Sequence, residues 1–298
     1  GDHRDLHLSI RRQRQMCIRD SLYTVVYWIE AFHTQSRDVT APQQRLSGNY
    51  SGCSLRIEHP NRKYPAMPRL FTSLIAVGLL SIAPAFAQDR PVVVELYTSQ
   101  GCSSCPPADE MFAELSKRDD VIALALHVDY WDYIGWQDPF GAPEHAERQR
   151  AYALTGGRKS IYTPEMIVNG QSDVVGAKPM KLMEAINKHK EDAPQVDLSI
   201  ARDGETLRIN AHTVSGAAGP FDVHMLRYHP MAVTQVKRGE NAGHTFENYN
   251  IVEGWQTVDQ WDGQAPLSLS AAITGDMPVV VLVQRSNAGP IVAAARIK

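Results

Sequence analysis

Two cysteines separated by two residues lie between an apolar run and a helix-like segment, and this arrangement constrains the fold more than any other feature. The apolar, β-branched residues 92–97 lead towards Cys102-Ser-Ser-Cys105, and residues 108–117 follow with helical spacing. This order predicts a strand, a tight turn and a helix. Two cysteines three positions apart can share the first turn of a helix, where free N–H groups and the helix dipole stabilise a thiolate. We therefore expect Cys102 to form mixed disulfides and Cys105 to resolve them.

A Cys-x-x-Cys pair has two other common uses, as half of a zinc site or as an inert structural bridge. A structural zinc site needs four ligands, usually from two paired motifs. The sequence holds four cysteines, and the other two, Cys17 and Cys53, lie in a segment that we discount below. Because no second Cys-x-x-Cys is present, the sequence favours a redox pair.

Composition and charge limit the classes of partner. The 298 residues are 43% apolar, enough for a substantial core and for one or two domains. A net charge of -3 and a pI near 6.4 give no footprint for nucleic acid or for an anionic membrane surface. We therefore expect no nucleic-acid partner.

The chain before Gln88 is expected to contribute nothing to the folded protein. Residues 1–66 are basic and irregular, so we interpret them as spurious or disordered, with a genuine N-terminal extension as the alternative. Residues 67–87 combine a positive start, an apolar run and an Ala-Phe-Ala site, the three parts of a signal peptide. The apolar run is shorter than the ~20 residues of a membrane span, which argues against an anchor. The mature protein is thus predicted to be bacterial and periplasmic or secreted, without a membrane segment, where disulfides persist.

After Gln88, strand and helix patterns alternate up to residue 193, and strand patterns dominate from residue 194. The elements expected first are strands over 91–97, 121–128, 165–168 and 172–175 and helices over 108–118, 143–154 and 178–190. The elements expected next are a hairpin over 195–212 and strands over 221–228, 277–285 and 291–297. Residues 239–244 are expected to be a polar loop. We predict an α/β domain over 88–193 and a small antiparallel β domain, sandwich-like, over 194–298.

The order of elements in the first domain resembles the thioredoxin fold. Residues 95–109, 127–132 and 162–164 are similar to a family of secreted bacterial thioredoxin-like proteins known as a domain of unknown function. The similarity covers the whole mature chain. It implies that Pro164 follows a cis peptide bond beside the dithiol, and that the backbone of Thr163 pairs with a bound thiol substrate. An ordinary trans proline at the start of a strand is the alternative.

Three polar residues near the motif are candidates for tuning it. Glu95 is either a buried acid that relays protons to the resolving thiol or a surface glutamate. His127 and Asp129 end the second predicted strand, near the edge where α/β folds place ligand groups. His127 could tune Cys102 or bind a metal ion, and a hydrogen-bonded structural histidine is the alternative.

The sequence as a whole predicts an exported thiol–disulfide oxidoreductase that acts on protein or small thiol substrates and needs no cofactor beyond its disulfide. This hypothesis requires an accessible Cys102 and a Pro164 that lies close to both sulfurs. An aromatic stretch is predicted to form a peptide-binding rim, or otherwise core or lid, through Tyr130, Trp131 and Trp136. The alternatives are a non-enzymatic Cu(I)-handling protein, with or without His127 as a ligand, and a binding protein whose bridge is locked.

Overall fold

One continuous eight-stranded sheet organises the computed structural model, which describes residues 90–214 and 217–298. The predictions for residues 1–66 and for a signal peptide over 67–87 lie outside these residues. The first elements are β1 Val92–Thr98, α2 Pro106–Leu115, β2 Val121–His127, the 3-10 turn Asp132–Ile134, α3 Pro143–Thr155, β3 Glu165–Val168, β4 Ser172–Val175 and α4 Pro179–Lys190. The remaining elements are β5 Val196–Asp203, β6 Thr206–Thr213, β7 Phe221–Gln235, β8 Thr245–Trp261, β9 Leu267–Ala272, β10 Val279–Arg285 and β11 Ile291–Ile297.

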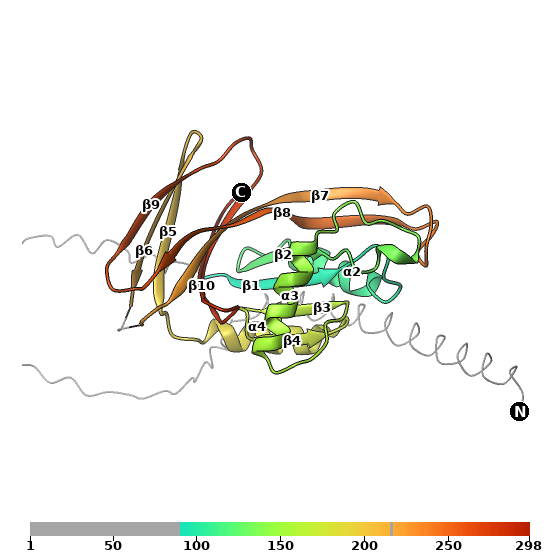
Figure 1. Ribbon diagram of the computed structural model, residues 1–298, viewed down its shortest axis with the longest axis horizontal. Helices are drawn as coiled ribbons and strands as arrows, with labels where there is room; N and C mark the ends of the chain where they lie inside the picture. Colours follow the sequence, from blue (N-terminus) through green and yellow to red (C-terminus); the bar gives the residue numbers. More distant parts are fainter. Residues whose placement is uncertain (1–89, 215–216) are drawn as a thin grey trace, which may run out of the picture. The chain divides into compact units, whose positions relative to one another are not determined.

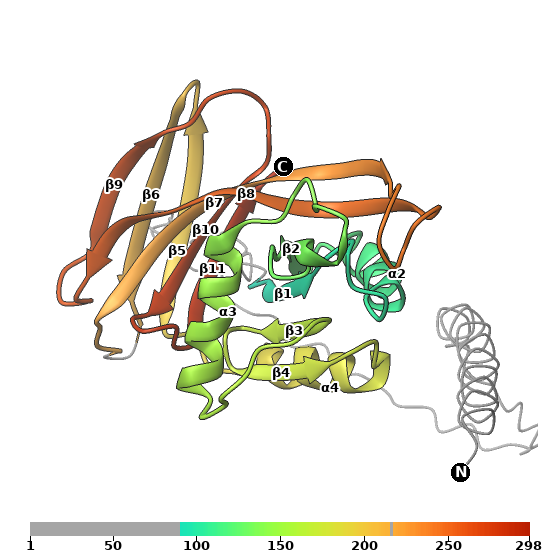
Figure 2. The ribbon, with the colours of Figure 1, turned by 45° about the vertical axis from the view of Figure 1, so that its right-hand side comes forward.

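Strands from both halves of the chain share the large sheet, whose order is β11-β10-β7-β8-β2-β1-β3-β4 (Figures 1 and 2). Strands β1 and β2 are parallel, and β3 and β4 add to them in antiparallel fashion. Strand β8 joins β2 in parallel through the pair Ala125 and Ile251. The predicted boundary between residues 193 and 194 therefore does not separate two sheets, and a division into two folding domains stays a prediction.

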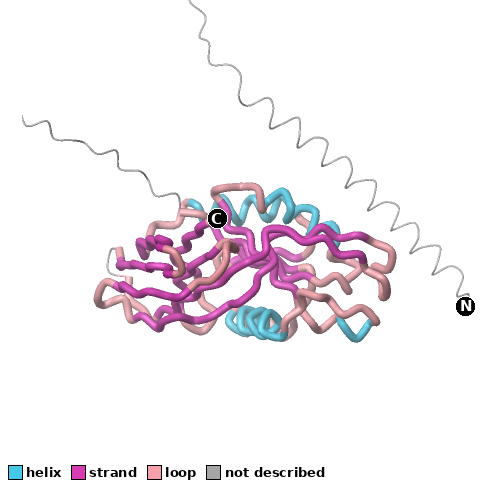
Figure 3. The backbone as a smooth tube through the Cα atoms, turned by 90° about the horizontal axis from the view of Figure 1, so that it is seen from above, coloured by secondary structure: helices cyan, strands magenta, loops and turns pink. Residues whose placement is uncertain are grey.

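Helices cover both faces of the central strands, as Figure 3 shows from above. Strands β1 and β2 are buried on both faces, which explains their continuous apolar sequences. On one face, Val94 and Leu96 pack with Phe112 of α2 and with Leu182 and Ile186 of α4. On the other face, α3 contributes to a separate apolar cluster with side chains of β7, β8 and β10. The fold is thus mixed α/β, as predicted.

The second sheet is three-stranded and antiparallel, in the order β5-β6-β9. Its apolar side chains, including Leu207 and Ile209, pack against Phe221, Val223 and Val281 of the large sheet. This packing gives the sandwich-like arrangement predicted for the end of the chain. Strands β8 and β9 were not predicted, and β7 is seven residues longer than the predicted strand, which ended at Tyr228.

The distal half of the β7–β8 hairpin, residues 229–251, extends past α2 and is called the arm below (Figures 1 and 2). Its tip, residues 236–244, includes the predicted polar loop. None of the helices in residues 90–214 and 217–298 is long and apolar enough to cross a lipid bilayer.

Candidate functional site

The two cysteines of the motif lie between β1 and α2 and form a disulfide, with their Cα atoms 5.4 Å apart. Cys105 is the N-cap residue of α2, and the two prolines after it occupy the first helical positions, as predicted. Cys102 lies in the turn before the helix, where its N–H donates to the carbonyl of Ser99 at 3.1 Å. The expectation that both cysteines share the first helical turn is therefore corrected, because only Cys105 reaches the helix.

Both sulfur-bearing side chains are buried in the disulfide form, with Cys102 1% and Cys105 0% exposed. The accessible Cys102 that the redox hypothesis requires is thus not found in this form. An attacking thiolate can reach Cys102 only after the side chains over it move.

The hydroxyl group of Ser104 lies between the disulfide and the loop that precedes β3. The Oγ of Ser104 lies 3.3 Å from the Sγ of Cys102 and 3.4 Å from the carbonyl oxygen of Thr163. The peptide bond between Thr163 and Pro164 is cis, as the sequence predicted. The structure therefore brings together the Cys-x-x-Cys motif and the Thr-Pro loop, which are 58 residues apart from Cys105 to Thr163.

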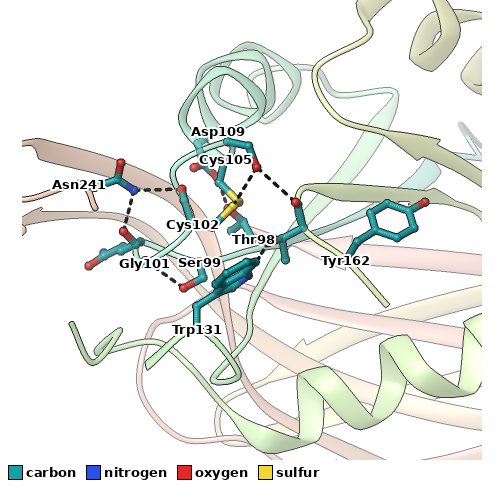
Figure 4. Close-up of a disulfide and its surroundings, with 12 residues drawn as sticks. Thr98, Ser99, Gly101, Cys102, Cys105, Asp109, Trp131, Tyr162 and Asn241 are labelled. Carbon is teal, nitrogen blue, oxygen red and sulfur yellow. Dashed lines mark hydrogen bonds between the residues drawn. A yellow bond between two sulfur atoms is a disulfide. The ribbon is translucent and has the colours of Figure 1, made fainter. Parts of the chain in front are cut away.

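The predicted aromatic rim divides between two sides of the motif. Trp131 packs over Gly101, where an added Cβ would lie 3.2 Å from the tryptophan Cβ, and its Nε1 donates to Thr163 Oγ1 at 2.7 Å (Figure 4). Trp136 lies on the side of the arm, where its Nε1 donates to Gln100 Oε1 at 3.1 Å. Tyr130 points away to α3 and donates to Gln149.

Tyr133, which belongs to the same aromatic stretch, is 79% exposed and stacks on Trp131 with ring centroids 6.4 Å apart.

A polar group lies behind the disulfide at the ends of β1 and β2, where Thr98, His127 and Asp138 are buried and Asp109 is partly exposed. Asp109 of α2 accepts a hydrogen bond from Thr98 Oγ1 at 2.8 Å, and His127 pairs with Asp138 at 2.8 Å. Burial raises the pKa of Asp109 to about 7, against the lowering effects of the His127 charge and the Thr98 hydrogen bond. Burial also opposes charge on His127, but Asp138 and then Asp109 raise the pKa of His127 above its ordinary value.

His127 is therefore a hydrogen-bonded residue of this polar group, and Asp109 is a site residue that the sequence analysis did not single out. The Nε2 atom of His127 is buried and has no hydrogen-bond partner among the described residues. Asp129 is partly exposed, and its carbonyl accepts the N–H of Asp132. Within residues 90–214 and 217–298, no group of three or more His, Cys, Asp or Glu side chains is placed to hold a metal ion.

Glu95 is buried, as one of the two interpretations expected, but it does not lie behind the cysteines. Its carboxylate pairs with Arg148 of α3 at 2.6 Å and accepts from the hydroxyl of Tyr152 at 2.6 Å. Side chains alternate along a strand, so Glu95 points to the α3 face while Thr98 points to the α2 face. The structure thus places Asp109, rather than Glu95, on the same side as Cys105.

The arm completes the site from a part of the chain about 140 residues away. The side-chain amide of Asn241 donates to the carbonyls of Gln100 and Cys102, at 2.9 and 3.0 Å (Figure 4). The side chain of Asn248 accepts from Gln100 Nε2 at 2.8 Å. All four of these residues are buried, so the hydrogen bonds from the arm hold the turn that carries Cys102.

These features define a mixed α/β protein that carries an oxidised Cys-x-x-Cys pair beside a cis-proline loop. The chain belongs to the family described as Protein of unknown function (DUF1223), whose model matches residues 93–284. A crystal structure of protein AGR_C_4864 from Agrobacterium tumefaciens is similar, with 32% identity and a TM-score of 0.61 over 71% of this chain and 96% of that one.

A second solved structure, HBP35 of Porphyromonas gingivalis, is similar with a TM-score of 0.52 and 18% identity, over 70% of this chain and 74% of that one. At this identity the likeness concerns the fold alone. No curated protein gives a significant match.

Proposed function

We propose that this protein is an exported thiol–disulfide oxidoreductase with a thioredoxin-like core. The observation that carries the proposal is the contact of the Cys102–Cys105 disulfide with the cis Thr163–Pro164 loop through Ser104. A disulfide and an adjacent loop whose backbone can pair with a bound substrate are the two parts that would hold a partner sulfur in place for exchange. The signal peptide predicted over residues 67–87 supports an oxidising compartment.

The thioredoxin-like assignment is supported by four neighbouring strands. Strands β2-β1-β3-β4 lie in that order, with β1 and β2 parallel and β3 and β4 antiparallel. Helix α2 follows the disulfide, and the cis-proline loop leads into β3. This is the arrangement that the resemblance of the sequence to thioredoxin-like proteins implies.

The reaction is a two-electron exchange between a partner dithiol and the Cys102–Cys105 disulfide. A partner thiolate attacks the Sγ of Cys102, the bond to Cys105 breaks, and Cys105 leaves as a thiolate. A second partner thiolate then attacks the partner's sulfur in the mixed disulfide and releases Cys102. The partner loses two electrons and becomes a disulfide, while the Cys102–Cys105 pair gains them. A partner disulfide oxidises the reduced Cys102–Cys105 pair by the same steps in reverse.

Asp109 is positioned to exchange the proton of Cys105. The two residues are four apart on one helix, so their side chains share a face, and the N–H of Asp109 donates to the carbonyl of Cys105 at 3.1 Å. A carboxyl group with a pKa of about 7 is half protonated near neutral pH. It can therefore give a proton to the leaving thiolate and take it back when the disulfide forms again.

Burial of Cys102 makes local opening a required step of this proposal. Ser104 is exposed, Trp131 is partly exposed, and the backbone turn is held by Asn241. Movement of these three groups would admit a partner sulfur, whereas the core strands beneath need not change.

Substitution of each cysteine tests the proposal directly. Cys102→Ser is expected to abolish turnover of a model disulfide, because it removes the exchanging sulfur. Cys105→Ser is expected to trap mixed disulfides at Cys102, because the resolving thiol is lost; mass spectrometry after non-reducing electrophoresis detects them. Absence of both turnover and trapped adducts would remove the enzyme proposal. Tight stoichiometric binding of Cu(I) to the reduced protein, again without turnover, would favour the metal-handling alternative.

A further inference from the structure

The hydroxyl group of Ser104 serves two neighbours with one hydrogen atom. Its Oγ lies 3.3 Å from Cys102 Sγ and 3.4 Å from the carbonyl oxygen of Thr163. A serine hydroxyl donates a single hydrogen bond, so it cannot satisfy both acceptors at once. Ser104 is exposed, and its hydroxyl therefore has room to rotate between them.

The redox state of Cys102 decides which acceptor is the stronger. In the disulfide, Cys102 carries no charge and sulfur accepts hydrogen bonds weakly, so the carbonyl oxygen of Thr163 takes the hydrogen. After reduction, a Cys102 thiolate carries a full negative charge, and hydrogen bonds to charged acceptors are roughly twice as strong as neutral ones. The hydrogen then moves to the sulfur.

We propose that Ser104 is a positioning residue that transfers its hydroxyl hydrogen bond from the Thr163 carbonyl to the Cys102 thiolate when the disulfide is reduced. The transfer stabilises the thiolate. It also leaves the Thr163 carbonyl free to accept an N–H group from an extended polypeptide partner. The preference of the reduced form for such a partner rests on the proposed oxidoreductase function, whereas the contact with the thiolate does not.

The chain supplies a matched control in Ser103, the other residue between the two cysteines. Ser103 is exposed like Ser104, but in the described part of the chain no hydrogen bond joins its hydroxyl to another residue. Replacement of either serine by alanine removes one hydroxyl group from the same turn. The titratable groups near the two cysteines, Asp109, His127 and Asp138, are unchanged in both variants.

The test measures the apparent pKa of Cys102 in the reduced protein. Iodoacetamide alkylation is followed between pH 4 and 9 by tandem mass spectrometry of the peptide that contains Cys102 and Cys105, in which fragment ions assign the modification to one cysteine or the other. Ser104→Ala is expected to raise this pKa by about one unit, since a charge-assisted hydrogen bond is lost. Ser103→Ala is expected to leave it unchanged, and Ser104→Thr to restore it. An unchanged value in Ser104→Ala, or an equal rise in both alanine variants, would overturn the proposal.

The transfer itself is tested by nuclear magnetic resonance of the Thr163 carbonyl carbon. Its resonance is expected to move on reduction in the wild type and in Ser103→Ala, and to stay in place in Ser104→Ala. A shift of the same size in all three proteins would contradict the transfer. Neither measurement needs turnover, so a failure of the oxidoreductase proposal in the cysteine variants is distinguishable from a failure of this one.

Discussion

Glu95 of β1 and Asp109 of α2 are both acidic side chains near the motif, but only Glu95 is paired with a positive charge. Glu95 faces α3, where Arg148 and Tyr152 both bond to its carboxylate. Asp109 faces β1, where a hydrogen bond from the neutral hydroxyl of Thr98 is its direct side-chain contact. Burial without an adjacent guanidinium favours the protonated carboxyl, which is why the pKa of Asp109 is raised to about 7.

This environment gives Asp109 a pH-dependent effect on stability. The folded protein holds the proton of Asp109 up to pH 7, while the unfolded chain releases it near pH 4. The folded state therefore binds more protons over this range, and the free energy of unfolding falls as pH rises from about 4 to about 7. The contribution is fully present below about pH 4 and is lost above about pH 7.

The prediction is that Asp109→Asn removes this slope, because an amide keeps the acceptor for Thr98 and cannot ionise. Relative to the wild type, the variant is expected to gain on the order of 2–4 kcal/mol of unfolding free energy between pH 4 and pH 8. Urea unfolding of the oxidised proteins at several pH values measures the free energy of unfolding and its dependence on pH. Glu110→Gln, one residue along and exposed, is the control and should follow the wild type. Parallel pH curves for wild type and Asp109→Asn would show that Asp109 is ionised throughout.

The sequence located the cysteine pair because its motif is short and local, and the resemblance to thioredoxin-like proteins implied the cis proline. It could not choose between Glu95 and Asp109 as the acid near Cys105. That choice depends on which face of β1 receives α2 and on Arg148, which is 53 residues further along the chain from Glu95. The burial of Cys102 depends likewise on groups from the Thr-Pro loop and the arm.

At the scale of elements, the arm contacts the turn of the motif, as does the aromatic segment after β2 through Trp131 and Trp136. Asn241 bonds the backbone of the turn, while Asn248 bonds the side chain of Gln100. Breaking a buried hydrogen bond costs about 1–3 kcal/mol when a partner is left unsatisfied. We therefore expect the arm to be one of the elements that set how often the Cys102 turn opens.

We predict that Asn241→Ala makes the disulfide more reactive without unfolding the protein. Loss of both amide hydrogen bonds frees the carbonyls of Gln100 and Cys102, so the turn should open roughly tenfold more often for a cost of about 1.4 kcal/mol. The rate of reduction of the disulfide by excess dithiothreitol measures this. Glu240→Ala, at the adjacent exposed position of the same tip, should leave the rate unchanged. Equal rates in the two variants would mean that the arm does not control access.

The arm also explains which elements the sequence analysis missed. Strand β8 contains Asn248, Asn250 and Gly254, residue types that usually mark turns. In the structure the two asparagines are buried and bond to Gln100 and to the carbonyl of Ala123, so their polar character serves tertiary contacts. Asn250 and Gly254 have positive φ values of 47° and 68°, which interrupt the regular alternation of a strand. Helices α2, α3 and α4 were predicted because their periodicity is local.

At the scale of the whole molecule, the two halves of the chain share one core. The apolar cluster beneath α3 combines Tyr97, Leu124 and Leu126 from the first half with six side chains from the second half, namely Leu226, Tyr228, Val252, Val280, Leu282 and Ile291. Arg148 of α3 also donates to Gln284 of β10 at 2.9 Å. The predicted boundary at residue 194 marks a change in the sequence pattern, but the segments on its two sides share an apolar cluster and one sheet.

The last prediction follows from the size of that cluster. Each fully buried apolar side chain contributes roughly 1.5–3 kcal/mol, whereas a whole domain is stable by about 5–15 kcal/mol. Loss of the six partners from the second half would remove an amount comparable to the total, so a fragment of residues 88–193 is expected not to fold alone. Its amide resonances should be poorly dispersed and its thermal melt should lack a cooperative step. A protein of residues 88–298, by contrast, should unfold in one transition by both near-ultraviolet circular dichroism and tryptophan fluorescence.

A cooperative melt of the shorter fragment would establish residue 194 as a true domain boundary, because the α3 face of β1 and β2 would then be stable without β7, β8 and β10.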